Sequence, residues 1–221
     1  MARRLLFDID NTLFPTAEFA ERARRNAVRA MVAAGLDMGE ARLYCLLMKQ
    51  VARKGSNYEH HFDDLCKSLG ISKPAKYVAA AVAAYHDTKN AIQPYPEVPR
   101  TLLKLRELGH PLYIATSGTA VKQWDKLIRM GLTPYFDDVF VTEELGAEKG
   151  PLFFRKVLKK LKAKPSECIM VGDRMDMDIL PAMKAGIKAV RVLRGPYSKK
   201  KGSAAAEIKA LSSLPSALRR I

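Results

Sequence analysis

Short apolar runs of β-strand type alternate with amphipathic helical stretches along most of this 221-residue chain. This alternation is typical of βαβ units, in which parallel strands form a sheet that helices cover on both faces. We therefore expect an α/β fold with a mostly parallel sheet flanked by helices. The expected strands cover residues 5–9, 112–116, 139–142, 168–173 and 189–193, and the expected helices between them cover 97–108, 120–130, 150–162 and 176–185.

Residues 16–92 interrupt this alternation, because they contain no convincing strand. Helical patterns cover about 16–34, 39–53, 58–69 and 74–89, with Thr16 as the expected N-cap of the first. Four helices with short connections predict a small helical bundle. We expect two domains: a core made of residues 1–15 and 93–221, and an all-α cap made of residues 16–92, inserted after the first strand.

The chain is strongly basic, with 38 Lys and Arg against 23 Asp and Glu and a formal net charge of +15. Clustered basic residues would indicate a nucleic-acid binder, but these are spread along the chain and no RNA-binding or zinc-finger motif accompanies them. We expect no dedicated nucleic-acid binding and favour a surface that attracts small anionic substrates. A non-catalytic, basic nucleic-acid-binding protein is the alternative of a different class.

No run of about 18 apolar residues is present, so we expect no membrane-spanning helix. The first residues lack the apolar stretch of a signal peptide. Cys45, Cys66 and Cys168 have no metal-type spacing and are interpreted as reduced thiols packed in the core. Together these features favour a cytoplasmic protein, with no oligomeric state assigned.

Polar residues end three of the expected strands. Asp8 and Asp10 close the first apolar run, and Asp173 closes the fourth. Thr116 and Ser117 lie at the end of the second. Ligands of open parallel sheets bind outside the carboxyl ends of the strands, and alternate residues of a strand share a face. Neighbouring carboxylates repel unless a cation relieves them, and oxygen ligands suit Mg²⁺, so we expect a magnesium-assisted acidic site.

Four segments in a fixed order resemble the motifs of the haloacid dehalogenase-like phosphohydrolases. They are FDIDNTL at 7–13, YIATSG at 113–118, EKGPLFF at 148–154 and VGDRMDMDILPAMKAG at 171–186. The resemblance spans the chain from residue 3 to about 195. It implies a Rossmann-like core with a helical cap that closes over the site and selects the substrate.

The resemblance also implies a role for each carboxylate. Asp8 would attack phosphorus and form an aspartyl-phosphate. Asp10 would protonate the leaving alcohol and then accept a proton from the hydrolytic water. Asp8, the main-chain carbonyl of Asp10, and Asp173 would hold Mg²⁺.

The remaining motif residues would hold the transferred phosphoryl group and its neighbours. Thr116 and Lys149 would bind the phosphoryl oxygens, with Ser117 beside them as a substrate-binding residue. Asp178 would orient Lys149 or a metal-bound water. Thr12 would support the first loop by hydrogen bonds.

The loop and helix at 53–65 of the expected cap have the turn composition of a segment that meets the substrate. Asn57 is the substrate-binding residue that we select there. The other candidates in this segment are Arg53, Lys54, Tyr58, His60 and His61.

The function expected from the resemblance is a Mg²⁺-dependent phosphatase of small phosphomonoesters. Nucleoside 5′-monophosphates are the first candidates, because the opening motif and the helical insertion resemble the branch of pyrimidine 5′-nucleotidases and phosphoglycolate phosphatases. A phosphosugar mutase and a 2-haloacid dehalogenase on the same fold are the enzymatic alternatives. Asp10 favours phosphoester chemistry, because an alkoxide leaving group needs a proton and a halide does not.

Overall fold

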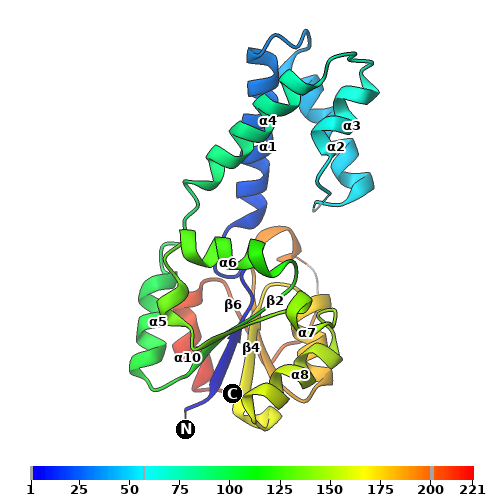
Figure 1. Cartoon of the computed structure of the whole chain (residues 1–221). Coiled ribbons are helices and arrows are strands. Elements are labelled where there is room, and N and C mark those ends of the chain that lie inside the picture. Colours follow the sequence, from blue (N-terminus) through cyan, green and yellow to red (C-terminus); the bar gives the residue numbers. More distant parts are fainter. Residues whose placement is uncertain (1, 57, 200–201) are drawn as a thin grey trace. The chain divides into compact units, whose positions relative to one another are not determined.

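The computed structural model describes residues 2–56, 58–199 and 202–221, which form two compact units. The first unit consists of residues up to Ala17 together with Gln93–Ile221, and the second is Glu18–Ile92. The first holds the sheet and the second is helical (Figure 1). The assignment of these units as a catalytic core and a substrate-selecting cap stays a prediction.

Six strands in the described residues form one sheet in which every neighbouring pair is parallel. The strand order is β3-β2-β1-β4-β5-β6. The α/β class and the flanked parallel sheet are therefore confirmed. The strands are β1 (Arg4–Phe7), β2 (Leu112–Thr116), β3 (Asp138–Val141), β4 (Cys168–Gly172), β5 (Lys188–Val192) and β6 (Ala206–Ile208).

The strand order reverses at β1, which makes its carboxyl end the topological switch point of the sheet. The chain runs outward from β1 to β2 and β3, and then returns to the other side of β1 as β4. Phe7 pairs with Ile114 of β2 and with Val171 of β4, so these three strands end close together. Ligands of open α/β sheets bind at such a switch point.

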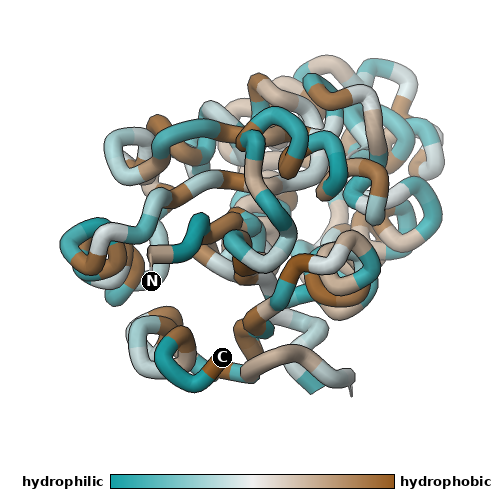
Figure 2. Tube along the Cα trace, turned by 90° about the horizontal axis from the view of Figure 1, so that it is seen from below, coloured by the Kyte–Doolittle hydropathy of each residue, from teal (hydrophilic) through white to brown (hydrophobic). Residues whose placement is uncertain are grey.

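Helices cover both faces of the sheet, with α5 and α10 on one side and α7 and α8 on the other (Figure 1). Helix α6 crosses the end of the sheet where the polar residues lie. The helices alternate between apolar and polar residues along their length (Figure 2), as half-buried helices do. Their bounds are α5 (Val98–Glu107), α6 (Ala120–Arg129), α7 (Thr142–Leu145), α8 (Pro151–Leu161), α9 (Leu180–Lys184) and α10 (Leu214–Leu218).

The helical unit has its own apolar core, built from Leu43 and Leu47 of α2 together with Met31 and Leu65, all of which are fully buried. Helix α1 begins in the first unit and continues through the second. The four helices are α1 (Thr16–Ala33), α2 (Glu40–Lys54), α3 (His61–Ser68) and α4 (Ala75–Lys89).

Several local expectations need correction. Thr16 is the first helical residue of α1 rather than its N-cap. Its hydroxyl donates to the Asp10 carboxylate. Cys66 and Cys168 are buried free thiols as expected, but Cys45 is exposed on α2. In the described part of the chain, no helix is both long enough and apolar enough to cross a membrane.

Candidate active site

A buried ion-pair cluster lies at the carboxyl end of β1. Lys149 Nζ lies 2.6 Å from Asp8 Oδ1 and 2.5 Å from Asp178 Oδ1. Burial alone would lower the pKa of Lys149, but the charges of Asp178 and Asp8 outweigh it and raise that pKa. Lys149 therefore carries a positive charge at neutral pH. The structure brings these three predicted residues together from three separate motifs.

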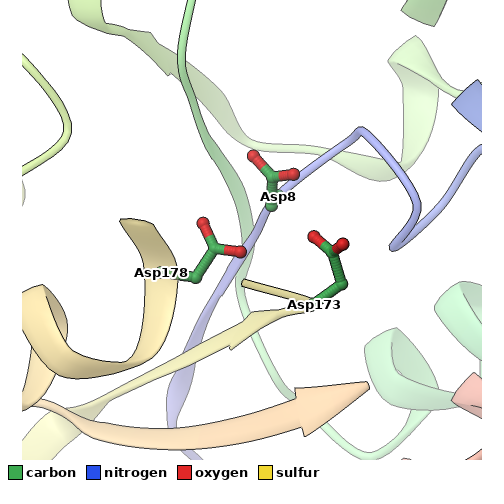
Figure 3. A group of neighbouring side chains, drawn as sticks. All are labelled: Asp8, Asp173 and Asp178. Atoms are coloured by element: carbon green, nitrogen blue, oxygen red, sulfur yellow. The ribbon is translucent and has the colours of Figure 1, made fainter. Parts of the chain in front are cut away.

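Asp173 completes a group of three carboxylates with Asp8 and Asp178. One carboxylate oxygen from each lies within 4.8 Å of the others. Figure 3 shows Asp8 after β1, Asp173 after β4 and Asp178 on a helical turn, with the three side chains grouped together. Asp173 Oδ2 is buried and has no hydrogen-bond partner among the described residues.

Two of these carboxyl groups, Asp8 and Asp173, have raised pKa values because they are buried. Burial raises the pKa of Asp173 to about 8, and the negative charges of Asp8 and Asp178 act in the same direction. Burial also raises the pKa of Asp8 to about 6, although Lys149 opposes the shift. A divalent cation would satisfy the unpaired Asp173 oxygen and relieve this repulsion, so the donor set fits a hard cation such as Mg²⁺.

A single π-helical turn, Met175–Ile179, presents Asp178 to the cluster. Asp178 Oδ2 accepts a hydrogen bond of 2.9 Å from the Arg174 N–H, while Oδ1 faces Lys149. The turn packs tightly on β4, because a Cβ at Gly172 would lie 2.5 Å from Asp178 Cγ. Turns of this type occur often at functional sites. An α-helix was expected over residues 176–185, and the π-turn replaces its first part.

Thr116 ends β2 beside the cluster with its hydroxyl unused. The residue is 1% exposed, and Oγ1 has no hydrogen-bond partner within the described part of the chain. A buried hydroxyl without a partner is costly, so Oγ1 is a natural contact for a bound anion. Ser117 follows as a half-buried residue whose main-chain carbonyl accepts 2.8 Å from Gln123 Nε2.

The side chain of Asp10 lies outside the group of three carboxylates. Its Oδ1 accepts hydrogen bonds of 2.5 Å from both Thr16 Oγ1 and Lys126 Nζ. The preceding turn is shaped by Asn11, which has a left-handed backbone (φ 54°) and accepts 3.1 Å from the Ala17 N–H. Sequence reasoning paired Asp8 and Asp10 on one strand face. In the structure, Asp8 pairs with Lys149 and Asp10 pairs with Lys126.

Thr12 supports the first loop through its main chain. Its N–H donates to the Ile9 carbonyl at 3.3 Å, and its carbonyl accepts from Arg194 at 3.5 Å. Its hydroxyl is buried without a hydrogen-bond partner among residues 2–56, 58–199 and 202–221. The expected side-chain hydrogen bond is therefore not observed.

The candidate substrate contacts of the helical unit bind other residues of the same unit. Asn57 lies outside the described residues. Lys54 Nζ lies 3.4 Å from Asp64, whose carboxylate also accepts 2.9 Å from the Tyr58 hydroxyl. His61 is buried against the Gly55 carbonyl at 2.9 Å, whereas the His60 side chain is 67% exposed. Contact of these residues with substrate stays a prediction.

Three residues near the site were missed by sequence reasoning: Gln123, Lys126 and Arg191. Arg191 is 1% exposed and donates to the Asp173 carbonyl at 3.4 Å and to the Tyr197 carbonyl at 2.7 Å. An arginine inside the apolar run AVRVL was a usable signal, because a buried charge needs partners. Gln123 and Lys126 stand one turn apart on α6, and nothing local in the sequence distinguishes them from surface residues.

Comparison with known proteins identifies the family. A family model described as haloacid dehalogenase-like hydrolase matches residues 2–186. A glyceraldehyde 3-phosphate phosphatase from Methanopyrus kandleri is 50% identical over 201 residues, covering 89% of this chain and 86% of that protein. The chain belongs to the haloacid dehalogenase-like hydrolases. The glyceraldehyde 3-phosphate phosphatase from Methanocaldococcus jannaschii is 43% identical, with 89% and 87% covered.

Solved structures of this hydrolase family show the same fold. The crystal structure of a phosphatase of the family from Thermococcus onnurineus has a TM-score of 0.70 and 26% identity, and the alignment covers 98% of this chain and 97% of that one. The prediction of a phosphohydrolase is therefore confirmed at the level of family and enzyme class. As a haloacid dehalogenase-like hydrolase of the phosphatase class, the chain is an enzyme rather than a non-catalytic binding protein.

The expected preference for nucleotides receives no support from these relatives. A pyrimidine 5′-nucleotidase from Streptococcus pneumoniae is 28% identical over 196 residues, far below the two phosphatases of glyceraldehyde 3-phosphate. The predicted family is confirmed, and the nucleotide preference is not.

Proposed function

We propose that this hydrolase is a Mg²⁺-dependent phosphatase of small phosphosugars, with glyceraldehyde 3-phosphate as the first candidate substrate. The observation that carries the proposal is the cluster at the carboxyl end of β1. It combines a charged lysine between two carboxylates with two buried oxygens, Asp173 Oδ2 and Thr116 Oγ1, that lack partners in the described chain. The names of the two most similar relatives reported above support the phosphosugar.

Asp8 is the proposed nucleophile. Its Oδ1 is held by Lys149, which leaves Oδ2 to attack phosphorus. With a pKa of about 6, the carboxyl is ionised at neutral pH and above. A bond forms between Asp8 and phosphorus as the bond from phosphorus to the ester oxygen breaks, giving an aspartyl-phosphate.

Asp10 is the proposed acid and base. The leaving group of glyceraldehyde 3-phosphate is an alkoxide, which takes its proton from the carboxyl of Asp10. Water then attacks the aspartyl-phosphate, Asp10 accepts a proton from that water, and inorganic phosphate and free Asp8 result. Each turnover thus restores both aspartates.

The other residues stabilise the charge of the transferred group. Lys149 and the Thr116 hydroxyl bind phosphoryl oxygens, and Asp178 keeps Lys149 in place. Asp8, Asp173 and the main-chain carbonyl of Asp10 would hold Mg²⁺. When bound, the ion offsets the repulsion between the anionic substrate and the carboxylates.

A panel of phosphomonoesters tests the substrate. Phosphate release is measured with Mg²⁺ for triose phosphates, hexose phosphates and nucleoside monophosphates, using wild type, Asp8→Asn and wild type with EDTA. We expect kcat/KM for glyceraldehyde 3-phosphate to exceed that for any nucleoside monophosphate by about tenfold or more, a discrimination that a few pocket contacts provide. Preference for nucleotides would reject the phosphosugar, and equal activity of Asp8→Asn would reject the mechanism.

A further inference from the structure

Asp10 is fixed from two sides on a single oxygen. Within the part of the chain that the structure describes, its donors are Thr16 Oγ1 and Lys126 Nζ, each 2.5 Å from Oδ1. The Asp10 and Lys126 side chains are 33% and 20% exposed, so the ion pair is partly shielded from water. Occupation of Oδ1 leaves Oδ2 as the oxygen that exchanges a proton with the substrate.

Lys126 is itself held in place by the loop that follows β2. Gln123 lies one turn earlier on α6, is 5% exposed, and accepts 3.3 Å from Lys126 Nζ through its Oε1. Its Nε2 donates 2.8 Å to the Ser117 carbonyl. Residues three apart on a helix are neighbours, which explains why one helix can make both contacts. Helix α6 therefore connects the loop at Thr116 and Ser117 with Asp10.

We propose that Lys126 is a positioning residue, which orients the Asp10 carboxyl for proton transfer to the leaving oxygen. This inference rests on the proposed function, in which Asp10 is the acid. Asp10 lies on a loop beyond β1, where a lone carboxylate could rotate. A charge-assisted hydrogen bond restricts that rotation, and small errors in the position of a catalytic group reduce rates strongly.

The consequence is a selective loss of activity that depends on the leaving group. An alkyl phosphate such as glycerol 3-phosphate expels an alkoxide and needs the proton from Asp10. A nitrophenyl phosphate expels a stabilised phenolate and does not. Because kcat/KM reports the steps up to the first irreversible one, it isolates transfer to Asp8 from the later hydrolysis.

The experiment compares these two substrates for Lys126→Met, Lys126→Gln, Lys126→Arg and a control, Lys122→Met. Lys122 is an exposed lysine on the same helix. We expect Lys126→Met and Lys126→Gln to lower kcat/KM for glycerol 3-phosphate by about 10- to 100-fold, part of the contribution of general acid catalysis. For nitrophenyl phosphate the loss should stay within about threefold, because no proton is required. Lys126→Arg should recover most of the alkyl activity and Lys122→Met should match wild type.

The readout is the ratio of the two kcat/KM values, which does not depend on how much of each preparation is folded. An unchanged ratio in the Met and Gln variants would overturn the proposal, whether the two kcat/KM values fall equally or both stay at the wild-type level. Wild type without Mg²⁺-dependent activity on either substrate would instead reject the proposed function. The two failures are therefore distinguishable.

Discussion

Lys149 is the side chain on which the buried site depends. Two carboxylates approach its ammonium, and the residue is 4% exposed. Removing one partner of a buried ion pair is costly because it leaves an uncompensated charge. Lys149 cannot neutralise three carboxylates alone. Burial raises the pKa of Asp173 most, and the negative charges of Asp8 and Asp178 raise it further.

Burial and this negative charge together make Asp173 a source of pH-dependent instability when no metal is bound. Its pKa is 3.8 in the unfolded reference and about 8 in the folded protein, so the folded state holds the proton more tightly. The stability from this group is therefore present below about pH 4 and is lost as the pH rises towards about 8. With EDTA, we expect Asp173→Asn to gain stability relative to wild type across that window, by on the order of a few kcal/mol.

Chemical denaturation at several pH values measures the difference between the two proteins. Mg²⁺ should stabilise wild type at pH 8 and have much less effect on Asp173→Asn. A difference between wild type and variant that stays constant from pH 4 to pH 8 would contradict the assignment of the raised pKa.

Among the elements, the contact between β4 and the π-helical turn controls the geometry of the site. A Cβ at Gly172 would lie 2.5 Å from Asp178 Cγ and 2.6 Å from its Cβ, and Asp178 is fixed by Lys149 and by the Arg174 N–H. The turn would have to move. We expect Gly172→Ala to lower the free energy of unfolding by about 1–3 kcal/mol, as overpacked buried sites do, and to reduce activity at least tenfold.

Gly39→Ala is the matched control, because nothing lies within 4 Å of the added Cβ and Gly39 is distant in sequence from the site. Its free energy of unfolding should change by less than about 1 kcal/mol. A Gly172→Ala protein as stable and active as this control would show that the turn is not tightly packed.

The strands and their polar ends could be predicted from the sequence, because apolar runs mark buried parallel strands and Asp8, Thr116 and Asp173 stand where those runs stop. The π-helical turn could not be predicted. It depends on Asp178 meeting Lys149, a contact that local periodicity does not encode. Helix α7 was missed for a simpler reason, since its residues Thr142–Leu145 make only one turn.

The role of Lys126 could not be predicted for a similar reason. Its partner Asp10 lies 116 residues away, and only the folded chain brings α6 to the first loop. Motif reasoning identifies residues that react, whereas residues that support them have no fixed spacing. The cluster of Asp8, Lys149, Asp173 and Asp178 was foreseeable because each member belongs to a motif.

The chain as a whole carries a net charge of +15, which should speed the arrival of anionic substrates. Salt screens this attraction, because the Debye length falls from about 30 Å at 0.01 M to about 8 Å at 0.15 M. We expect kcat/KM for glyceraldehyde 3-phosphate to fall several-fold between these concentrations of KCl at fixed Mg²⁺. The kcat should change by less than about twofold, because the charges act on encounter rather than on the bound substrate.

Steady-state kinetics at several KCl concentrations checks this expectation. A fall in kcat equal to the fall in kcat/KM would place the salt effect on the reaction itself and contradict steering by the net charge.

The proposed mechanism depends above all on Asp8 accepting the phosphoryl group. The direct measurement is acid quenching of the enzyme during turnover of glyceraldehyde 3-phosphate with Mg²⁺, followed by mass spectrometry of the peptides. We expect one added phosphoryl group on Asp8 in wild type and none in Asp8→Asn, which should also be inactive. A phosphoryl group on any other residue, or full turnover by Asp8→Asn, would contradict it.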